Sequence, residues 1–369
     1  MSVRRLLAAT AACLALTACT AFDSSVPTEP SPPPGTSDPS PTDTSTPSSS
    51  PTSTGGPVAP TTDLLDWKAV PGPVEEDVTR SSTFTVTVTA DNTTARIAGA
   101  QTLELGAGGR VQISTVLVDQ QRVVVVMEDE RAERGDEATI VDTSGGTAVL
   151  DASSSPPTTV GGTWAMSRET VVHATVPDDG DYCLATVSLE SGQGDSPWCA
   201  QERHGFRGAV ISDAGLSVMS FDDRRPASCA TLLAIDGADA TPFEGVTECR
   251  GWDAARLDDG AVWSEVPKPN RQEDADFHAR VGDTTYDLGP GTTGSLVWCG
   301  GAAYFVRDPQ ADADPARLMR FAPDGTLAVV YESVSQGNAF LSVPRCGGDA
   351  ITLTSYGDQG DEQVTADLG

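Results

Sequence analysis

Residues 115–126 read Thr-Val-Leu-Val-Asp-Gln-Gln-Arg-Val-Val-Val-Val, which is two apolar runs separated by a short polar turn. Five further segments repeat this arrangement, at 164–173, 210–218, 256–263, 297–305 and 344–352. The six turns begin at residues 119, 167, 212, 258, 299 and 346, so neighbouring turns are 48, 45, 46, 41 and 47 residues apart. Each segment therefore predicts a β-hairpin, and the even spacing predicts an internal repeat.

A repeat of this length with several short strands is typical of a β-propeller blade, a four-stranded antiparallel sheet. Residues 63–369 have room for about seven such blades, with six as the alternative. We label the strands of a blade a to d from the axis outward. Segments 94–106, 278–289 and 317–331 then fit c–d hairpins. A β-sandwich or jelly roll is the second candidate for this all-β chain, because it also has short strands joined by turns.

The last residues, 362–369, fall where strand c of a final blade is due. We therefore expect the N-terminal part of the chain to supply the outer strand of that blade and so close the ring. The alternating segment 83–89, Thr-Phe-Thr-Val-Thr-Val-Thr, is a suitable strand.

The N-terminus has the pattern of an export signal. Arg4 and Arg5 precede a short apolar stretch at 6–16, which is too short for an ordinary membrane-spanning helix. Residues 16–19, Leu-Thr-Ala-Cys, resemble the lipobox of bacterial lipoproteins. The resemblance implies a signal peptide at 1–18 and a diacylglycerol-type anchor, with palmitate-like chains, on Cys19. Pro, Ser and Thr dominate the stretch 20–62, which predicts a disordered linker that follows Cys19.

By its period and strand pattern, the region 63–369 resembles β-propellers of the broad WD40 and TolB-like type. Together with the lipobox, this makes the whole chain similar to a bacterial β-propeller lipoprotein. The resemblance implies a lipid-anchored protein on the extracytoplasmic face of the cell membrane. Lys68 and Lys268 are the two lysines, and the use of Arg in place of Lys, with abundant Ala, Gly, Asp and Val, indicates an actinobacterial source.

Six cysteines follow Cys19, an even number that favours disulfides in an exported chain. Six cysteines permit fifteen pairings, but equivalent places in the repeat restrict the choice. Strands c and d of two consecutive blades each carry one cysteine, and two adjacent blades each end strand a with one. The predicted pairs are Cys183–Cys199, Cys229–Cys249 and Cys299–Cys346. A metal site fits less well, because the chain has no Cys-x-x-Cys pair and only three histidines.

Motifs of catalysis are missing from the sequence. It has no Gly-x-Ser-x-Gly elbow, His-Glu-x-x-His pair, P-loop or dinucleotide-binding glycine motif. His173, His204 and His278 fall in different blades, and His173 lies in an apolar strand as a core residue would. We therefore predict no catalytic residue, no metal ligand and no cofactor, and a role other than that of an enzyme is favoured. The formal net charge of −30 disfavours nucleic acid as a partner.

Acidic residues recur in the connection between strands b and c of all six repeats. Because every b–c connection of a propeller emerges on the same side, these residues predict one acidic face that would attract a cation, such as Ca²⁺, or a basic peptide or protein. The alternative is that exposed loops are polar in any protein. The candidate residues of this acidic face are Asp178, Asp179, Asp222, Asp223, Asp274, Asp308, Asp312 and Asp358.

Two classes of function follow from these observations. The first is a binding or scaffold module at the cell envelope, whose acidic face or axial mouth holds a protein, a peptide or a small ligand. The second is a hydrolase or lyase of envelope carbohydrate, with carboxylates at the axis and Trp263 or Trp298 as a sugar platform. A structural envelope protein without a ligand is a third.

Overall fold

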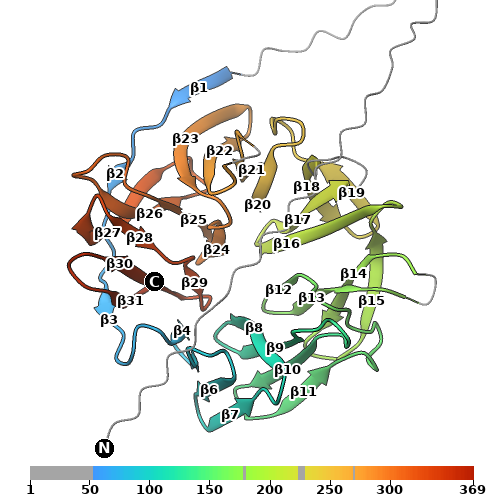
Figure 1. Cartoon of the computed structure of the whole chain (residues 1–369). Helices are drawn as coiled ribbons and strands as arrows, with labels where there is room; N and C mark the ends of the chain where they lie inside the picture. The colour runs from blue at the N-terminus through green and yellow to red at the C-terminus, as the bar shows by residue number, and fades with distance from the viewer. Residues whose placement is uncertain (1–52, 178–179, 223–228, 269–270) are drawn as a thin grey trace, which may run out of the picture. The chain divides into compact units, whose positions relative to one another are not determined.

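The computed structural model describes residues 53–177, 180–222, 229–268 and 271–369. Within these ranges the chain forms 31 β-strands in seven sheets around a common axis (Figure 1). The protein is therefore a seven-bladed β-propeller. None of the described residues forms a helix with the length and apolar character that a membrane crossing needs. Cys19 and the predicted signal peptide lie outside the described residues.

Blades I to IV each consist of four consecutive strands in the order a to d. The bounds are as follows. Blade I has β4 (Asp77–Arg80), β5 (Thr85–Val88), β6 (Thr94–Ala98) and β7 (Thr102–Gly106); blade II has β8 (Val111–Val118), β9 (Arg122–Asp129), β10 (Glu137–Asp142) and β11 (Thr147–Leu150); blade III has β12 (Trp164–Met166), β13 (Thr170–Thr175), β14 (Cys183–Ser188) and β15 (Gly194–Cys199); blade IV has β16 (His204–Ser212), β17 (Gly215–Asp222), β18 (Cys229–Asp236) and β19 (Asp239–Pro242).

Blades V to VII each include one strand from the N-terminal segment. Blade VII uses two short strands, β28 and β29, in the innermost position against β30. Blade V has β20 (Gly251–Leu257), β21 (Gly260–Glu265), β22 (Asp274–Val281), β23 (Thr284–Thr292) and β1 (Ser53–Pro57); blade VI has β24 (Val297–Cys299), β25 (Ala302–Arg307), β26 (Pro315–Phe321), β27 (Leu327–Gln336) and β2 (Thr61–Thr62); blade VII has β28 (Ala339–Leu341), β29 (Arg345–Cys346), β30 (Ala350–Gly357), β31 (Glu362–Asp367) and β3 (Lys68–Ala69).

All six predicted hairpins are a–b hairpins of blades II to VII, which confirms the register read from the sequence. The segments 94–106, 278–289 and 317–331 form c–d hairpins as predicted. The prediction for 83–89 is wrong. This segment contains β5, strand b of blade I, because the short a–b turn at 81–84 joins it to β4.

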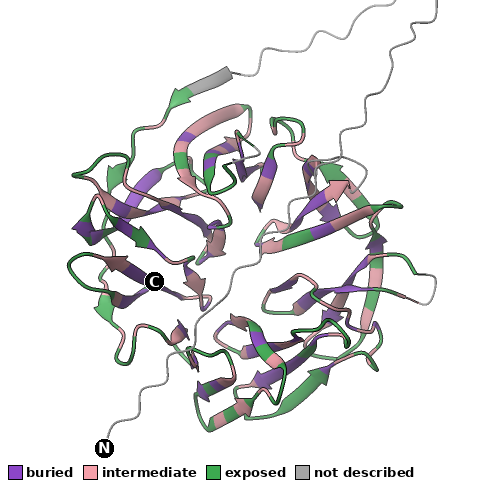
Figure 2. Ribbon diagram, in the orientation of Figure 1, coloured by how far each residue is buried: buried purple, intermediate pink, exposed green. Residues whose placement is uncertain are grey.

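The valine run of β9 shows why these sequences form blades. Val123 and Val125 pack toward blade I, whereas Val124 and Val126 pack toward blade III. Side chains alternate along a strand, so a strand between two neighbouring blades is apolar at every position. Figure 2 shows the result, with buried residues concentrated on the middle strands of the blades, such as β30, and mostly exposed residues on an outer strand such as β11.

Six apolar clusters hold the ring together, and each joins two consecutive blades from I–II to VI–VII. In the V–VI cluster, for example, Phe277 stacks on Phe305 with ring centroids 4.1 Å apart. Among the described residues, none of these clusters joins blade VII to blade I. That contact, which we call the seam, is polar.

Threonine and glutamine side chains of blade VII line the seam. On β30, Ile351 and Leu353 face blade VI, and Thr352 and Thr354 occupy the alternate positions. The Gln363 amide donates to the Glu76 carbonyl of blade I over 2.9 Å, and Arg345 pairs with Asp77. Gly347 allows close approach, because a methyl group there would lie 1.7 Å from the Arg80 carbonyl oxygen. The seam thus relies on hydrogen bonds and close backbone contact.

The segment 53–70, here called the belt, runs along the outer strands of blades V, VI and VII (Figure 1). β1 and β2 pair in parallel with β23 and β27, and β3 pairs antiparallel with β31. β3 therefore closes the ring from the N-terminal side, as expected, although with a different segment.

The belt also corrects the predicted domain boundary at Asp63. Residues 53–62 belong to the folded unit, because their backbone is hydrogen-bonded to blades V and VI. Their Pro and Thr content hides this from a sequence pattern, since backbone pairing needs no apolar side chain.

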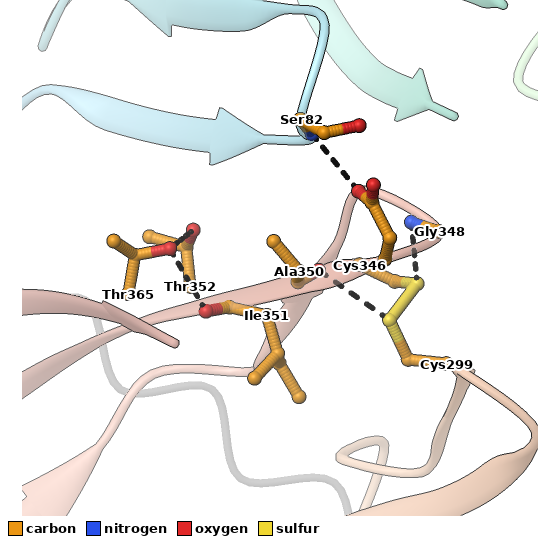
Figure 3. The surroundings of a disulfide bond; sticks show 9 residues. Ser82, Cys299, Cys346, Gly348, Ala350, Ile351, Thr352 and Thr365 are labelled. Atoms are coloured by element: carbon orange, nitrogen blue, oxygen red, sulfur yellow. Dashed lines mark hydrogen bonds between the residues drawn. A yellow bond between two sulfur atoms is a disulfide. The ribbon is translucent and has the colours of Figure 1, made fainter. Parts of the chain in front are cut away.

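The three predicted disulfides are all present. Cys183–Cys199 joins strands c and d of blade III, and Cys229–Cys249 lies in blade IV and the connection that follows it. Cys299–Cys346 joins the innermost strands of blades VI and VII, next to the seam (Figure 3).

Trp67 attaches the belt to β27 of blade VI. Its indole is half-buried, packs edge-on against Tyr331 with centroids 5.2 Å apart, and donates to the Val330 carbonyl over 2.7 Å. Trp67→Ala should lower the free energy of unfolding by about 2–3 kcal/mol. The control Leu64→Ala removes a belt side chain that is 54% exposed and should change it by less than about 0.5 kcal/mol. Urea unfolding measures both, and equal losses would contradict an anchoring role for Trp67.

The disulfide beside the seam should stabilise the fold more than the one within blade III. Cys299 and Cys346 are 47 residues apart in sequence, and Cys183 and Cys199 are 16 apart. Loop-closure entropy predicts losses of about 4 and about 3 kcal/mol for the two Cys→Ser double variants. Chemical denaturation of both variants checks this, and a larger loss for the blade III pair would contradict it.

Candidate functional site

A cavity of about 900 Å³ opens at the axis, on the side of the a–b turns. Its wall consists of the innermost strands and a–b turns of blades II, III, IV, VI and VII. The middle of the wall is apolar, with Val116, Val210 and Trp298 among its residues. The turns add the charged groups Asp119, Arg168, Glu169 and Asp213, and strand β29 adds Arg345. Apolar walls with a few charged groups are typical of ligand sites, and the volume suits a small molecule or a short peptide.

Side-chain oxygens hold several of these turns in place. The Oδ1 atom of Asp119 accepts hydrogen bonds from the backbone N–H groups of Gln121 and Arg122, at 2.6 and 2.7 Å. Ser167 has the same role in blade III, where its Oγ accepts from the N–H groups of Glu169 and Thr170. Such capping explains why Asp and Ser begin the hairpin turns, and it makes the rim of the cavity rigid.

Two charged groups on this wall have unused hydrogen-bonding capacity. Asp119 is only 9% exposed, and its second oxygen, Oδ2, is buried without a hydrogen-bond partner among the described residues. Arg345 pairs with Asp77 through Nη2, whereas its Nη1 is buried and has no partner within the described part of the chain. Arg345 and Val116 also line a second cavity, of about 250 Å³, between blades VII, I and II.

The disulfide Cys299–Cys346 lies in the wall of the axial cavity. Beside it the turn after Cys346 reaches across the seam, where Asp349 accepts a hydrogen bond from the Ser82 backbone N–H over 2.9 Å (Figure 3). The bridge therefore fixes blades VI and VII on one side of the cavity.

The residues predicted to form the acidic face lie elsewhere. Asp222, Asp274, Asp308, Asp312 and Asp358 are at the b–c ends of their blades, opposite the a–b turns that line the cavity. Asp178, Asp179 and Asp223 lie outside the described residues. Several of these carboxylates have local partners. Asp274 pairs with Arg271 at 3.0 Å, Asp308 accepts from the Thr292 hydroxyl at 2.9 Å, and Asp358 accepts from the Asn338 amide at 3.0 Å.

A cation site on this face stays a prediction. In the described ranges, no group of three or more His, Cys, Asp and Glu side chains has an arrangement that could hold a metal ion.

The aromatic and histidine candidates have mostly structural positions. Trp263 is 1% exposed and donates to the Glu265 carboxylate over 3.1 Å, so it belongs to the core between blades IV and V. His173 is fully buried, stacks on Trp164 and contacts the Ala174 carbonyl through Nδ1 at 2.9 Å. Burial lowers the pKa of His173, which keeps the ring neutral. Trp298, in contrast, lines the axial cavity.

Asp253 is a half-buried carboxylate that the sequence did not single out. It lies near the start of β20, where its Oδ2 accepts hydrogen bonds from the Gly294 N–H at 2.9 Å and the Ser264 hydroxyl at 3.1 Å. Burial raises the pKa of Asp253 to about 6, against these hydrogen bonds and the positive charge of Arg207. Arg207 itself lies over the Trp252 ring at 4.6 Å. A β-bulge in β20, at residues 252–253, places Asp253 and Trp252 here.

Comparison with known proteins gives the fold and no family. No family model and no curated protein matches the chain. The propeller domain of the Trilobed protease from Pyrococcus furiosus is similar, with a TM-score of 0.54, 9% identity, and coverage of 80% of this chain and 96% of that one. A prolyl endopeptidase gives 0.52 at 13% identity over 79% of this chain, which spans only 46% of that enzyme. TolB from Acinetobacter baumannii has a TM-score of only 0.40, at 8% identity over 79% of this chain and 78% of that one. At these identities the similarity shows a β-propeller alone.

Asp253 should make the stability of the protein depend on pH. Its pKa of about 6 in the folded state exceeds the ordinary value of 3.8, so its neutral form stabilises the fold below about pH 4. That contribution is lost as the pH rises through 6. The free energy of unfolding of Asp253→Asn, taken relative to that of the wild type, should therefore rise by on the order of 2 kcal/mol between pH 4.5 and pH 7.5. Asp258→Asn, an exposed carboxylate at the other end of β20, is the control. Thermal unfolding at both pH values measures the gain, and parallel behaviour of the two variants would contradict it.

Proposed function

We propose that the protein is a binding module that holds a small ligand or a short peptide in the axial cavity. One observation carries this proposal. Apolar strands and charged turns from five blades surround one cavity of about 900 Å³, and two of its charged groups have unused hydrogen-bonding atoms. A built, partly apolar cavity with a few polar anchors is what ligand binding requires.

The sequence suggests where the module acts. The export signal and the lipobox support attachment through Cys19 to the outer side of the cell membrane, with the stretch 20–52 between the anchor and the propeller. On this proposal the ligand comes from the cell envelope or from the space outside it.

A carbohydrate hydrolase or lyase is the second candidate, and one observation favours it. Trp298 lies in the wall of the same cavity as the carboxylates of Asp119, Glu169 and Asp213. An aromatic platform beside carboxylates suits a sugar. Turnover separates the two candidates, since a binding module releases its ligand unchanged.

A rim substitution that fills the cavity tests the proposal. Asp213 is exposed, lies in the a–b turn of blade IV directly after Ser212, and lines the cavity. Asp258 begins the same kind of turn in blade V, is also exposed, and is not part of the cavity wall. Asp213→Trp should therefore block the cavity, and Asp258→Trp is its matched control.

Calorimetric titration of the full-length chain with tripeptides and with envelope oligosaccharides gives the readout. We expect a ligand from these panels to bind, Asp213→Trp to weaken binding at least about tenfold, and Asp258→Trp to bind as the wild type does. Equal effects of the two variants, or no binding in either panel, would overturn the proposal. Chromatography of the titrated ligand detects cleavage, which would favour the hydrolase.

A further inference from the structure

Blade I contributes no residue to the wall of the axial cavity. On either side of it, the turn of blade VII reaches the turn of blade II. A methyl group on Gly348, which has a φ of +86°, would lie 3.4 Å from Cα of Asp119 and 3.2 Å from the Gln120 amide.

This contact brings an acid and a base to the same part of the wall. Asp119 belongs to the turn that Gly348 touches, and Arg345 precedes Gly348 by three residues. The two side chains do not pair with each other. Asp119 uses Oδ1 for its own turn, and Arg345 uses Nη2 for Asp77. One acceptor atom, Oδ2, and one donor atom, Nη1, remain buried and unpartnered among the described residues.

Buried polar atoms without partners cost free energy, so a group from outside the chain that satisfies both would bind favourably. A cation alone would pair with Asp119 Oδ2 and leave Arg345 Nη1 without a partner. An anion alone would pair with Arg345 and leave Asp119 Oδ2 without one. A molecule with an ammonium and a carboxylate satisfies both. The second cavity, of about 250 Å³, adjoins Arg345 and is lined by Val88, Ile113 and Val116 together with Thr79 and Asn92. It has room for a small side chain.

We propose that Asp119 and Arg345 form a subsite for a zwitterion of the amino-acid class. Asp119 accepts hydrogen bonds from the ammonium group, and Arg345 donates to the carboxylate. The side chain next to the carboxylate enters the second cavity. The subsite rests on the proposed function and names the chemistry of its ligand. Free amino acids and short peptides with free ends share this chemistry.

Calorimetry on the full-length chain tests the subsite with alanine, trialanine, N-acetyl-trialanine and trialanine amide. We expect alanine or trialanine to bind, and the comparison of the two identifies the source of the zwitterion. Blocking either end of trialanine should weaken its binding at least about tenfold, because each block removes one of the two charges. Blocked and free peptides of equal affinity would overturn the proposal.

A matched pair of isosteric variants assigns the effect to the residue. Asp119→Asn keeps an oxygen to cap its turn but loses the negative charge, so it should bind the favoured zwitterion at least tenfold more weakly. Asp349→Asn changes a carboxylate of the neighbouring turn that is not part of the cavity wall and should bind normally. Melting temperatures of both variants confirm that they fold. Equal binding by Asp119→Asn and the wild type would overturn the subsite.

The subsite and the proposed function can fail separately. If oligosaccharides or blocked peptides bind and Asp213→Trp abolishes that binding, the cavity is a ligand site and the zwitterion subsite is wrong. If no probe of any class binds, both are wrong.

Discussion

The ring depends on how blade VII meets blade I. The other contacts between neighbouring blades each bury an apolar cluster, whereas at the seam the described residues contribute hydroxyl groups, the Gln363 amide and the Arg345–Asp77 pair. Hydrogen bonds in water add little net stability, so a polar contact of this kind is weak by itself. The chain itself also crosses the seam, because the belt ends with β3 of blade VII and continues into β4 of blade I. Cys299–Cys346 does not cross the seam but fixes blades VI and VII beside it.

The candidate subsite lies beside the same contact. Blade I adds no residue to the axial wall, and the turns of its two neighbours touch there, which brings Asp119 and Arg345 to one part of the wall. The second cavity is lined by residues of the same three blades. The weak point in the ring and a chemically distinct part of the cavity are thus neighbours.

The sequence was informative where the signal was local. A turn begun by Asp119 or Ser167 between apolar runs shows a hairpin directly, and the repeat then predicted the blades and all three disulfides. It missed β2 and β3, since two-residue strands held by backbone pairing have no side-chain pattern. It identified the acidic b–c ends and the axial mouth as candidate sites, but not the residues that line the cavity at the opposite ends. Cavity volume depends on how closely inner strands approach one another, and a bulge that no pattern shows places Asp253 beside Gly294 and Ser264.

The belt gives the propeller a defined order of mechanical failure. Tension applied at residue 53 first loads the short ladder between β1 and blade V, then the one between β2 and blade VI. Trp67 and β3, which complete blade VII, carry the load last. The two outer ladders can therefore yield and release length while the sheet beside the seam stays whole. A pull on the N-terminal side therefore detaches β1 and β2 before it separates the blades.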